Sequence, residues 1–229
     1  MTPRSNSNRT PAPGIFLVEA ILIIALFWAD IHRWHHVVVF SKTPYLLLLG
    51  WISLRLRGLT WRSIGMCRPE KWPRTIVLGL LAGCAIEALE LFITQPLLVH
   101  IFHQPPDLSA LNELRGHAGV LAIVLLLTWT LAAFGEELVW RGYLLNRIAD
   151  VLGSSPARWA ISLVVTSLAF GLAHYDQGRT GIVENAIDGA LLAALYLLAG
   201  RNLWASIIAH GITDTIDSLL LFSGHYPAS

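Results

Sequence analysis

The chain has 229 residues, of which 55% are hydrophobic and 14% are charged, and its mean hydropathy is +0.59. A soluble domain usually has about 25% charged residues, so this composition excludes an ordinary water-soluble domain and predicts an integral membrane protein. The net charge of +1, without any run of basic residues, indicates no nucleic-acid partner.

The N-terminal end combines a polar tail with a strongly apolar segment. Residues 1–13 are polar and contain prolines, so we expect a disordered tail. Residues 14–31 have the length of a signal-peptide core, but no small-residue cleavage site follows them. We therefore expect an uncleaved first membrane helix, and a single transmembrane domain over residues 14–229.

Further apolar segments predict a polytopic helix bundle, because a helix needs roughly 20 residues to cross the hydrocarbon core of a bilayer. Seven segments qualify, near 14–31, 36–54, 75–101, 117–147, 157–174, 182–200 and 203–223. Lys42 and Pro44 interrupt the second one. An eighth crossing or a re-entrant piece has room in the second or third, so the expected fold is all-α with seven or eight transmembrane helices.

The distribution of basic residues predicts the orientation of these helices. With the N-terminus in the cytoplasm, twelve lysines and arginines fall on the inner side and four on the outer side. Cytoplasmic loops usually carry the excess, so we expect a cytoplasmic N-terminus. Seven spans would put the C-terminus outside, and an eighth would reverse it.

The fourth apolar segment ends in charged residues, Glu136, Glu137 and Arg141. Charges within a membrane need partners or a function. Glu137 and Arg141 are four residues apart with the acid first, which is the favourable order for a pair on a helix. We therefore interpret this pair as structural and Glu136 as the working carboxylate; the alternative is the interfacial end of a long helix.

Two later segments also place polar groups on apolar helices. Phe170 and His174 are four residues apart and share a helix face, although a lone histidine at a helix end is more often an interfacial residue. His210, Asp214 and Asp217 form one polar stripe. Polar groups at membrane depth face the bundle interior, so we expect an interior polar cavity. Spacing assigns no role to Glu87, Glu90, Glu184 and Asp188.

Together these three elements resemble the signature of one family. "EELVWR" matches an E-E-x-x-x-R motif, "FGLAH" an F-x-x-x-H motif, and "HGITD" an H-x-x-x-N motif with Asp in place of Asn. In this order they resemble the CPBP family (CAAX protease and bacteriocin-processing, also called ABI), whose members are intramembrane endopeptidases. The resemblance covers roughly residues 117–222.

The resemblance implies roles for the matching residues. Glu136 takes the position of the general base that activates water, and His174 that of the histidine holding the water. His210 and Asp214 take the positions that stabilise the oxyanion. An aspartate donates a hydrogen bond only when protonated, so this role requires Asp214 to be in its neutral form. The supporting positions are filled by Glu137, Arg141 and Phe170.

The same resemblance implies a hydrolase without a cofactor or a metal ion, in contact with membrane lipid and with a membrane-associated peptide or protein substrate. The expected location is a bacterial plasma membrane. Three alternatives stay open: a metal-dependent membrane protease, a non-catalytic immunity or adaptor protein on the same scaffold, and an ion-coupled transporter. The first lacks an H-E-x-x-H motif, and the last predicts internal repeats, which the sequence does not contain.

Overall fold

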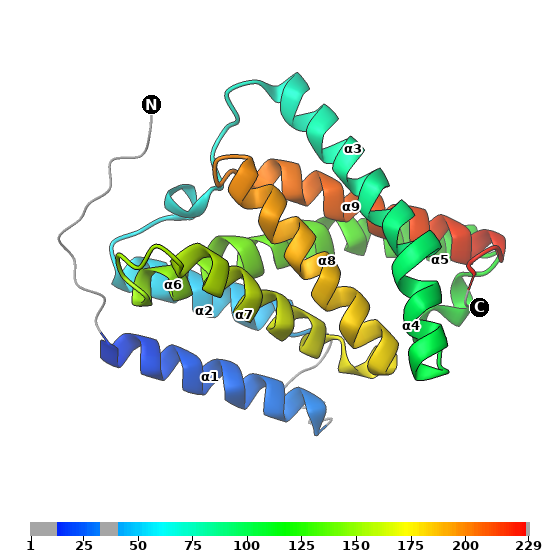
Figure 1. Cartoon of the computed structure of the whole chain (residues 1–229), viewed down its shortest axis with the longest axis horizontal. Coiled ribbons are helices and arrows are strands. Elements are labelled where there is room, and N and C mark those ends of the chain that lie inside the picture. Colours follow the sequence, from blue (N-terminus) through cyan, green and yellow to red (C-terminus); the bar gives the residue numbers. More distant parts are fainter. Residues whose placement is uncertain (1–12, 33–40, 228–229) are drawn as a thin grey trace.

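The computed structural model describes residues 13–32 and 41–227, and within them all regular structure is helical (Figure 1). The main helices are α1 (Pro13–Ile31), α2 (Thr43–Leu56), α3 (Trp72–Leu89), α4 (Gln95–Phe102), α5 (Ala118–Leu127), α6 (Leu145–Val151), α7 (Arg158–Ala173), α8 (Gly178–Leu198) and α9 (Leu203–Ser223). Short 3₁₀ turns lie at Trp61–Ile64, Ser109–Leu114 and Tyr175–Gln177. The all-α prediction is confirmed for the described residues.

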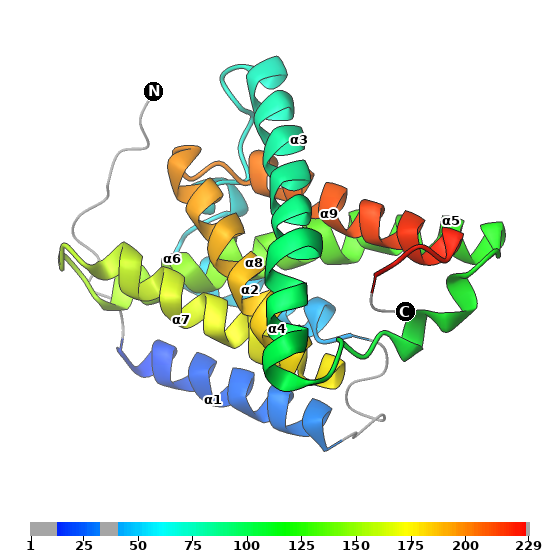
Figure 2. The ribbon, with the colours of Figure 1, turned by 45° about the vertical axis from the view of Figure 1, so that its right-hand side comes forward.

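Some of these helices join into longer rods through π-helical turns. Glu90–Thr94 connects α3 to α4, and Figure 2 shows the two as one continuous rod. Two π-helical stretches, Thr128–Glu136 and Leu138–Leu144, likewise connect α5 to α6. The second rod thus covers Ala118–Val151, 34 residues in all, which agrees with the unusually long fourth segment of the sequence.

Among the described residues, five helical rods are long and apolar enough to cross a membrane: Gly14–Ile31, Trp72–Phe102, Ala118–Val151, Tyr175–Leu198 and Leu203–Ser223. The other two predicted segments also form apolar helices, α2 and α7, but these have only 14 and 16 residues. The length and composition of the described helices therefore support five spans, and the count of seven or eight stays a prediction.

Some sequence-based predictions lie outside the described residues. They concern the disordered tail, of which only Pro13 is described, and residues 36–40 of the second apolar segment. Arg4, Arg9 and Arg33, which entered the charge count, are also outside.

Large apolar side chains cover the outside of the bundle. Many are more than half exposed, including Leu17, Ile24, Leu81, Phe92 and Leu168. A soluble protein rarely exposes so much contiguous apolar surface, whereas lipid tails accommodate it. With the long apolar helices, this surface identifies an integral membrane protein.

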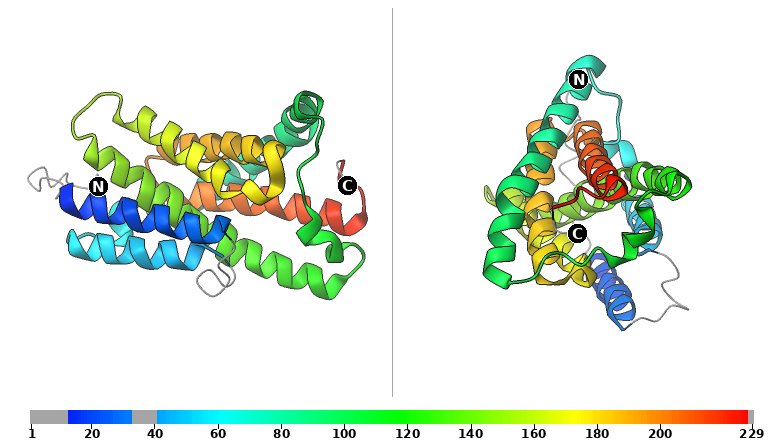
Figure 3. Two further views of the ribbon diagram at one scale, coloured as in Figure 1. Left: turned by 90° about the horizontal axis from the view of Figure 1, so that it is seen from below. Right: turned by 90° about the vertical axis from the view of Figure 1, so that its right-hand side faces the viewer.

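Helix α9 is the centre of the arrangement, because it packs against α3, α5, α8 and the 128–136 stretch. Helix α1 lies at the edge of the bundle beside α2 (Figure 3). A buried ion pair joins it to α6, where Arg147 Nε donates to Glu19 Oε2 at 2.6 Å. The central position of α9 brings its polar stripe next to the charged end of the 118–151 rod.

Glycines allow α3 to approach α9 closely. Gly79 and Gly83 are four residues apart on α3, the small-xxx-small pattern by which membrane helices pack. A Cβ added at Gly83 would lie 2.7 Å from the Ala209 carbonyl oxygen and 2.8 Å from Ile212 Cβ. The close contact between α3 and α9 therefore requires that residue 83 has no side chain. This contact holds α9 in place.

Gly83→Leu is expected to destabilise the protein by about 1–3 kcal/mol, the usual cost of overpacking, because α3 must move away from the backbone of α9. Gly119→Leu is the matched control, since a Cβ at Gly119 meets nothing within 4 Å. Thermal unfolding of both variants in detergent measures the difference. Equal melting temperatures would contradict the proposed contact.

Candidate active site

The charged end of the 118–151 rod is wound as a π-helix rather than the α-helix assumed from the sequence. The two π-helical stretches enclose Glu136 and Glu137. Bonding from residue i to i+5 puts more residues in each turn, so neighbouring side chains diverge less. π-Helical turns are rare and often mark functional sites. Here the π-helical winding surrounds the two adjacent glutamates of the first motif.

Glu137 and Arg141 form the predicted ion pair. Arg141 Nη1 donates to Glu137 Oε1 at 2.6 Å, and the two side chains are 2% and 0% exposed. Arg141 Nη2 also donates to the Gly189 carbonyl oxygen at 3.2 Å, and its Cζ lies 4.7 Å from the Phe170 ring centroid. The pair is therefore a buried junction between the 118–151 rod, α7 and α8.

His210 on α9 joins this pair. Its Nδ1 lies 2.9 Å from the same Glu137 Oε1. A carboxylate accepts hydrogen bonds, so Nδ1 carries the proton and donates, which fixes the ring. Nε2 lies 3.6 Å from Asp214 Oδ1, longer than a hydrogen bond. The hydrogen bond to Glu137, rather than a contact with Asp214, therefore fixes the direction in which Nε2 of His210 points.

Phe170 and His174 lie at the end of α7. His174 Nδ1 is 2.8 Å from the Phe170 carbonyl oxygen; because a carbonyl only accepts, Nδ1 carries the hydrogen. The Phe170 ring centroid lies 4.8 Å from that of His174 and 6.2 Å from that of His210. Phe170 therefore packs between the two histidines and against Arg141, and it keeps His174 and His210 apart.

Glu136 is half-buried and has a different environment from Glu137. Thr43 Oγ1, at the start of α2, lies 3.5 Å from Glu136 Oε1, at the limit of a hydrogen bond. This neighbour was missed in the sequence, where a threonine before an apolar segment is indistinguishable from a helix cap. Gly135 allows the approach, because a Cβ there would lie 2.9 Å from Thr43 Cγ2.

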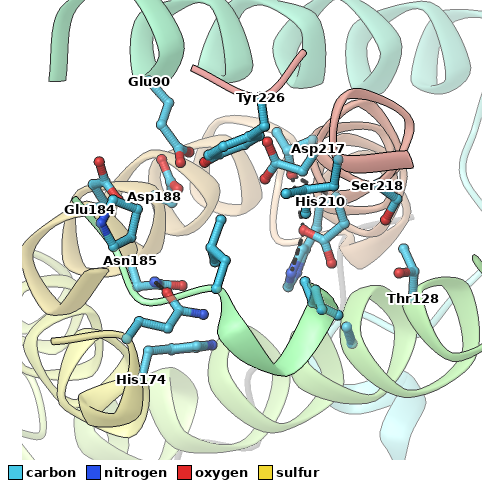
Figure 4. A pocket seen from close by; sticks show the side chains of 18 of the residues that line it. Glu90, Thr128, His174, Glu184, Asn185, Asp188, His210, Asp217, Ser218 and Tyr226 are labelled. Carbon is cyan, nitrogen blue, oxygen red and sulfur yellow. Dashed lines mark hydrogen bonds and ion pairs between the residues drawn. The ribbon is translucent and has the colours of Figure 1, made fainter. Parts of the chain in front are cut away.

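A pocket of about 250 Å³ opens beside these residues (Figure 4). Its lining includes all four predicted catalytic residues, Glu136, His174, His210 and Asp214. They come from three helical segments that are far apart in the sequence. The structure thus brings the four side chains to one pocket, while their catalytic roles remain predictions.

The pocket also contains acidic residues that the sequence left unassigned. These are Glu90, Glu184 and Asp188, and Asp217 of the predicted polar stripe lines the pocket with them. In Figure 4, Glu90, Glu184 and Asp188 are grouped on one side of the pocket; we call these three residues the acidic wall. Glu87 is buried, and its side chain forms a hydrogen bond with Asp217. The spacing of Glu87, Glu90, Glu184 and Asp188 along the sequence predicted no role for them, because only the packing of helices brings them together.

Tyr226, just beyond α9, also lines the pocket. It is 5% exposed, and its hydroxyl oxygen accepts a hydrogen bond of 2.8 Å from Gln95 Nε2. Burial raises the pKa of Tyr226 above its ordinary value, and the nearby Asp217 and Glu90 act in the same direction. The phenol therefore stays protonated at physiological pH.

The described residues include no group of three or more His, Cys, Asp or Glu side chains arranged to hold a metal ion. Cys67 and Cys84 are both free thiols. The expectation of a site without metal or cofactor stays a prediction, to be tested on the purified protein.

Comparison with known families agrees with the three motifs. Residues 118–216 match the family model described as type II CAAX prenyl endopeptidase Rce1-like. This match spans the 118–151 rod, α7, α8 and most of α9, so it contains every predicted site residue. Comparisons with curated proteins and with solved structures gave no match. Over residues 118–216, the chain is therefore similar to the type II CAAX prenyl endopeptidases described as Rce1-like.

Proposed function

We propose that the chain is an intramembrane endopeptidase that hydrolyses peptide bonds of membrane-associated or lipidated substrates with a water molecule activated by Glu136. The observation that carries the proposal is the common pocket of Glu136, His174, His210 and Asp214. Amide hydrolysis needs a base, a positioned water and donors aimed at the developing negative charge, and this set of side chains supplies candidates for each.

In the proposed mechanism Glu136 removes a proton from the water as its oxygen attacks the scissile carbonyl carbon. His174 accepts a hydrogen bond from that water at Nε2, because its Nδ1 is occupied by the Phe170 carbonyl. The carbonyl oxygen becomes an oxyanion beside His210 and Asp214. Glu136 then returns the proton to the leaving amine, and the peptide C–N bond breaks.

Glu137 and Arg141 are positioning residues in this scheme. Glu137 accepts hydrogen bonds from both Arg141 and His210, so its carboxylate has a structural role. Glu136, in contrast, faces the pocket. The difference between the two neighbours supports Glu136 as the base. A charge buried with two donors is poorly suited to accept a proton from water.

The proposal includes a membrane arrangement. Helices α2 and α7 complete a bundle of seven membrane helices with the five longer rods, and the pocket lies among them as an interior polar cavity. The N-terminus faces the cytoplasm of a bacterial cell, in keeping with the excess of basic residues on that side.

The experiment that tests this function compares the proteomes of membranes containing either the wild-type protein or Glu136→Ala. Peptides with new termini should accumulate only with the wild type, and they would identify the substrate. Identical proteomes would favour an immunity or adaptor role. If cleavage by the purified wild type stops with a chelator and returns with zinc, the metal-dependent alternative replaces this mechanism.

Asp214 is expected to tolerate an amide but not an apolar side chain. If it donates a hydrogen bond to the oxyanion, Asp214→Asn keeps or increases activity, while Asp214→Leu loses about a hundredfold, the scale of one oxyanion donor. Cleavage of one peptide by the three proteins measures this. An Asn variant that is folded but as poor as the Leu variant would instead make Asp214 a charged partner of His210, 3.6 Å away.

A further inference from the structure

The pocket has a strong excess of acidic groups. Besides Glu136 and Asp214, which belong to the proposed reaction, its lining contains the acidic wall of Glu90, Glu184 and Asp188, together with Asp217. No lysine or arginine occurs among the described residues that line it, and the two histidines lie at the reaction centre. The wall is therefore not neutralised by a cation of the chain itself.

One member of the wall has an unused hydrogen-bonding atom. Glu184 is 3% exposed and its carboxyl group forms a hydrogen bond with Gln95, but within the described part of the chain its Oε1 has no hydrogen-bond partner. A buried polar atom without a partner is costly and unusual in a native protein. Because Glu184 lines the pocket, a ligand in the pocket can supply the missing donor.

The neighbours of Glu184 are also carboxyl groups. Asp188 follows four residues later on α8, and it lies within hydrogen-bonding reach of Glu90 from the neighbouring rod. Carboxylates in an apolar environment repel one another unless a cation or protons separate them. An ammonium group with three N–H donors, or a guanidinium with five, would satisfy several of these oxygens at once.

We propose that the acidic wall is a subsite for a basic side chain, lysine or arginine, of the peptide substrate. The inference rests on the proposed endopeptidase function and adds to it a substrate preference. Because the acidic wall and Glu136 face one pocket of about 250 Å³, the basic residue lies within a few residues of the scissile bond. An apolar chain would leave Glu184 Oε1 without a donor, so the wall discriminates against it.

The first test uses the wild-type protein in lipid nanodiscs and fluorogenic peptides of one apolar sequence. A single position, moved along the peptide, carries lysine, norleucine or Nε-acetyllysine, so that length is kept while charge is removed. At one position near the cleaved bond, kcat/KM for the lysine peptide should exceed that for either neutral peptide by about tenfold or more, the effect of a charged hydrogen bond. Equal kcat/KM values at every position would overturn the subsite.

The second test assigns the preference to the wall. Glu184→Gln and Asp188→Asn should each reduce the ratio of kcat/KM between the lysine and norleucine peptides. Glu70→Gln makes the same chemical change at an exposed residue outside the pocket and should leave the ratio unchanged. An unchanged ratio in a folded wall variant would show that the preference arises elsewhere. If one wall variant does not fold, the other variant and the comparison of the three peptides with the wild-type protein still test the subsite.

Binding of the same peptides to the wild type, followed by fluorescence anisotropy, separates this inference from the proposed function. Tighter binding of lysine peptides without any cleavage would leave the subsite standing and contradict the endopeptidase. Cleavage without a preference for lysine in either assay would leave the endopeptidase standing and contradict the subsite.

Discussion

Glu136→Gln is expected to lower the rate of peptide-bond cleavage by about 10²- to 10⁴-fold, the contribution of a positioned general base. The amide keeps the shape of the side chain but cannot remove a proton from water. Glu136 is half-buried at the pocket, and its Oε1 accepts a long hydrogen bond of 3.5 Å from Thr43 Oγ1. The structure should therefore tolerate the change, and the melting temperature should stay close to that of the wild type.

The control for this experiment is Glu113→Gln, which makes the same change at an exposed residue that does not line the pocket. It should retain full activity. Purified proteins in detergent or nanodiscs, assayed with one peptide substrate, give both rates. Loss of activity in Glu137→Gln alone, with equal yields of folded protein, would reverse the roles of the two adjacent glutamates.

Glu137→Gln is expected to act mainly on stability. Removing one partner of a buried ion pair costs about 3–5 kcal/mol, and we expect the lower end of this range because the amide oxygen still accepts one hydrogen bond. Glu137 Oε1 serves two donors, Arg141 Nη1 at 2.6 Å and His210 Nδ1 at 2.9 Å. Arg141 would remain charged at 2% exposure, and His210 would lose the group that fixes its ring.

An exposed ion pair provides the comparison. Arg57 Nη1 donates to Asp150 Oδ2 at 2.9 Å, but the Asp150 side chain is 51% exposed. Such pairs contribute about 0–1 kcal/mol, so Asp150→Asn should change little. Reversible denaturation in mixed micelles measures the free energy of unfolding of both variants. Similar losses in the two would contradict the buried junction around Glu137.

The features that the sequence predicted correctly depend on local spacing. The apolar lengths of the 118–151 rod and of α9 required helices, and the four-residue separation of Glu137 and Arg141 required that their side chains meet once the segment was helical. The stripe of His210, Asp214 and Asp217 likewise faces one pocket, because one helix fixes the relative directions of all three.

The features that the sequence did not predict depend on packing between helices. The π-helical winding around Glu136 leaves no mark in hydrophobic periodicity. The contact between Glu137 and His210 spans 73 positions of the chain, and it requires α9 to be held near the 118–151 rod. The acidic wall escaped notice for the same reason, since Glu90 lies on a different rod from Glu184 and Asp188.

Two of the seven predicted spans form helices of only 14 and 16 residues, so the count of seven membrane spans stays a prediction. Lys42 and Pro44 shorten the second segment, because α2 begins at Thr43 with Pro44 in its first turn, a position that proline favours. Helix α7 ends at Ala173, where the following His174 turns its Nδ1 back to the Phe170 carbonyl. The end of α7 also places His174 at the pocket.

The most direct test of the central claim is a crystal structure of Glu136→Gln with an uncleaved substrate peptide. The account predicts the scissile carbonyl inside the pocket, with its oxygen about 3 Å from a donor on His210 or Asp214 and a water about 3 Å from residue 136 and from His174 Nε2. A peptide bound with its scissile bond outside the pocket would contradict it.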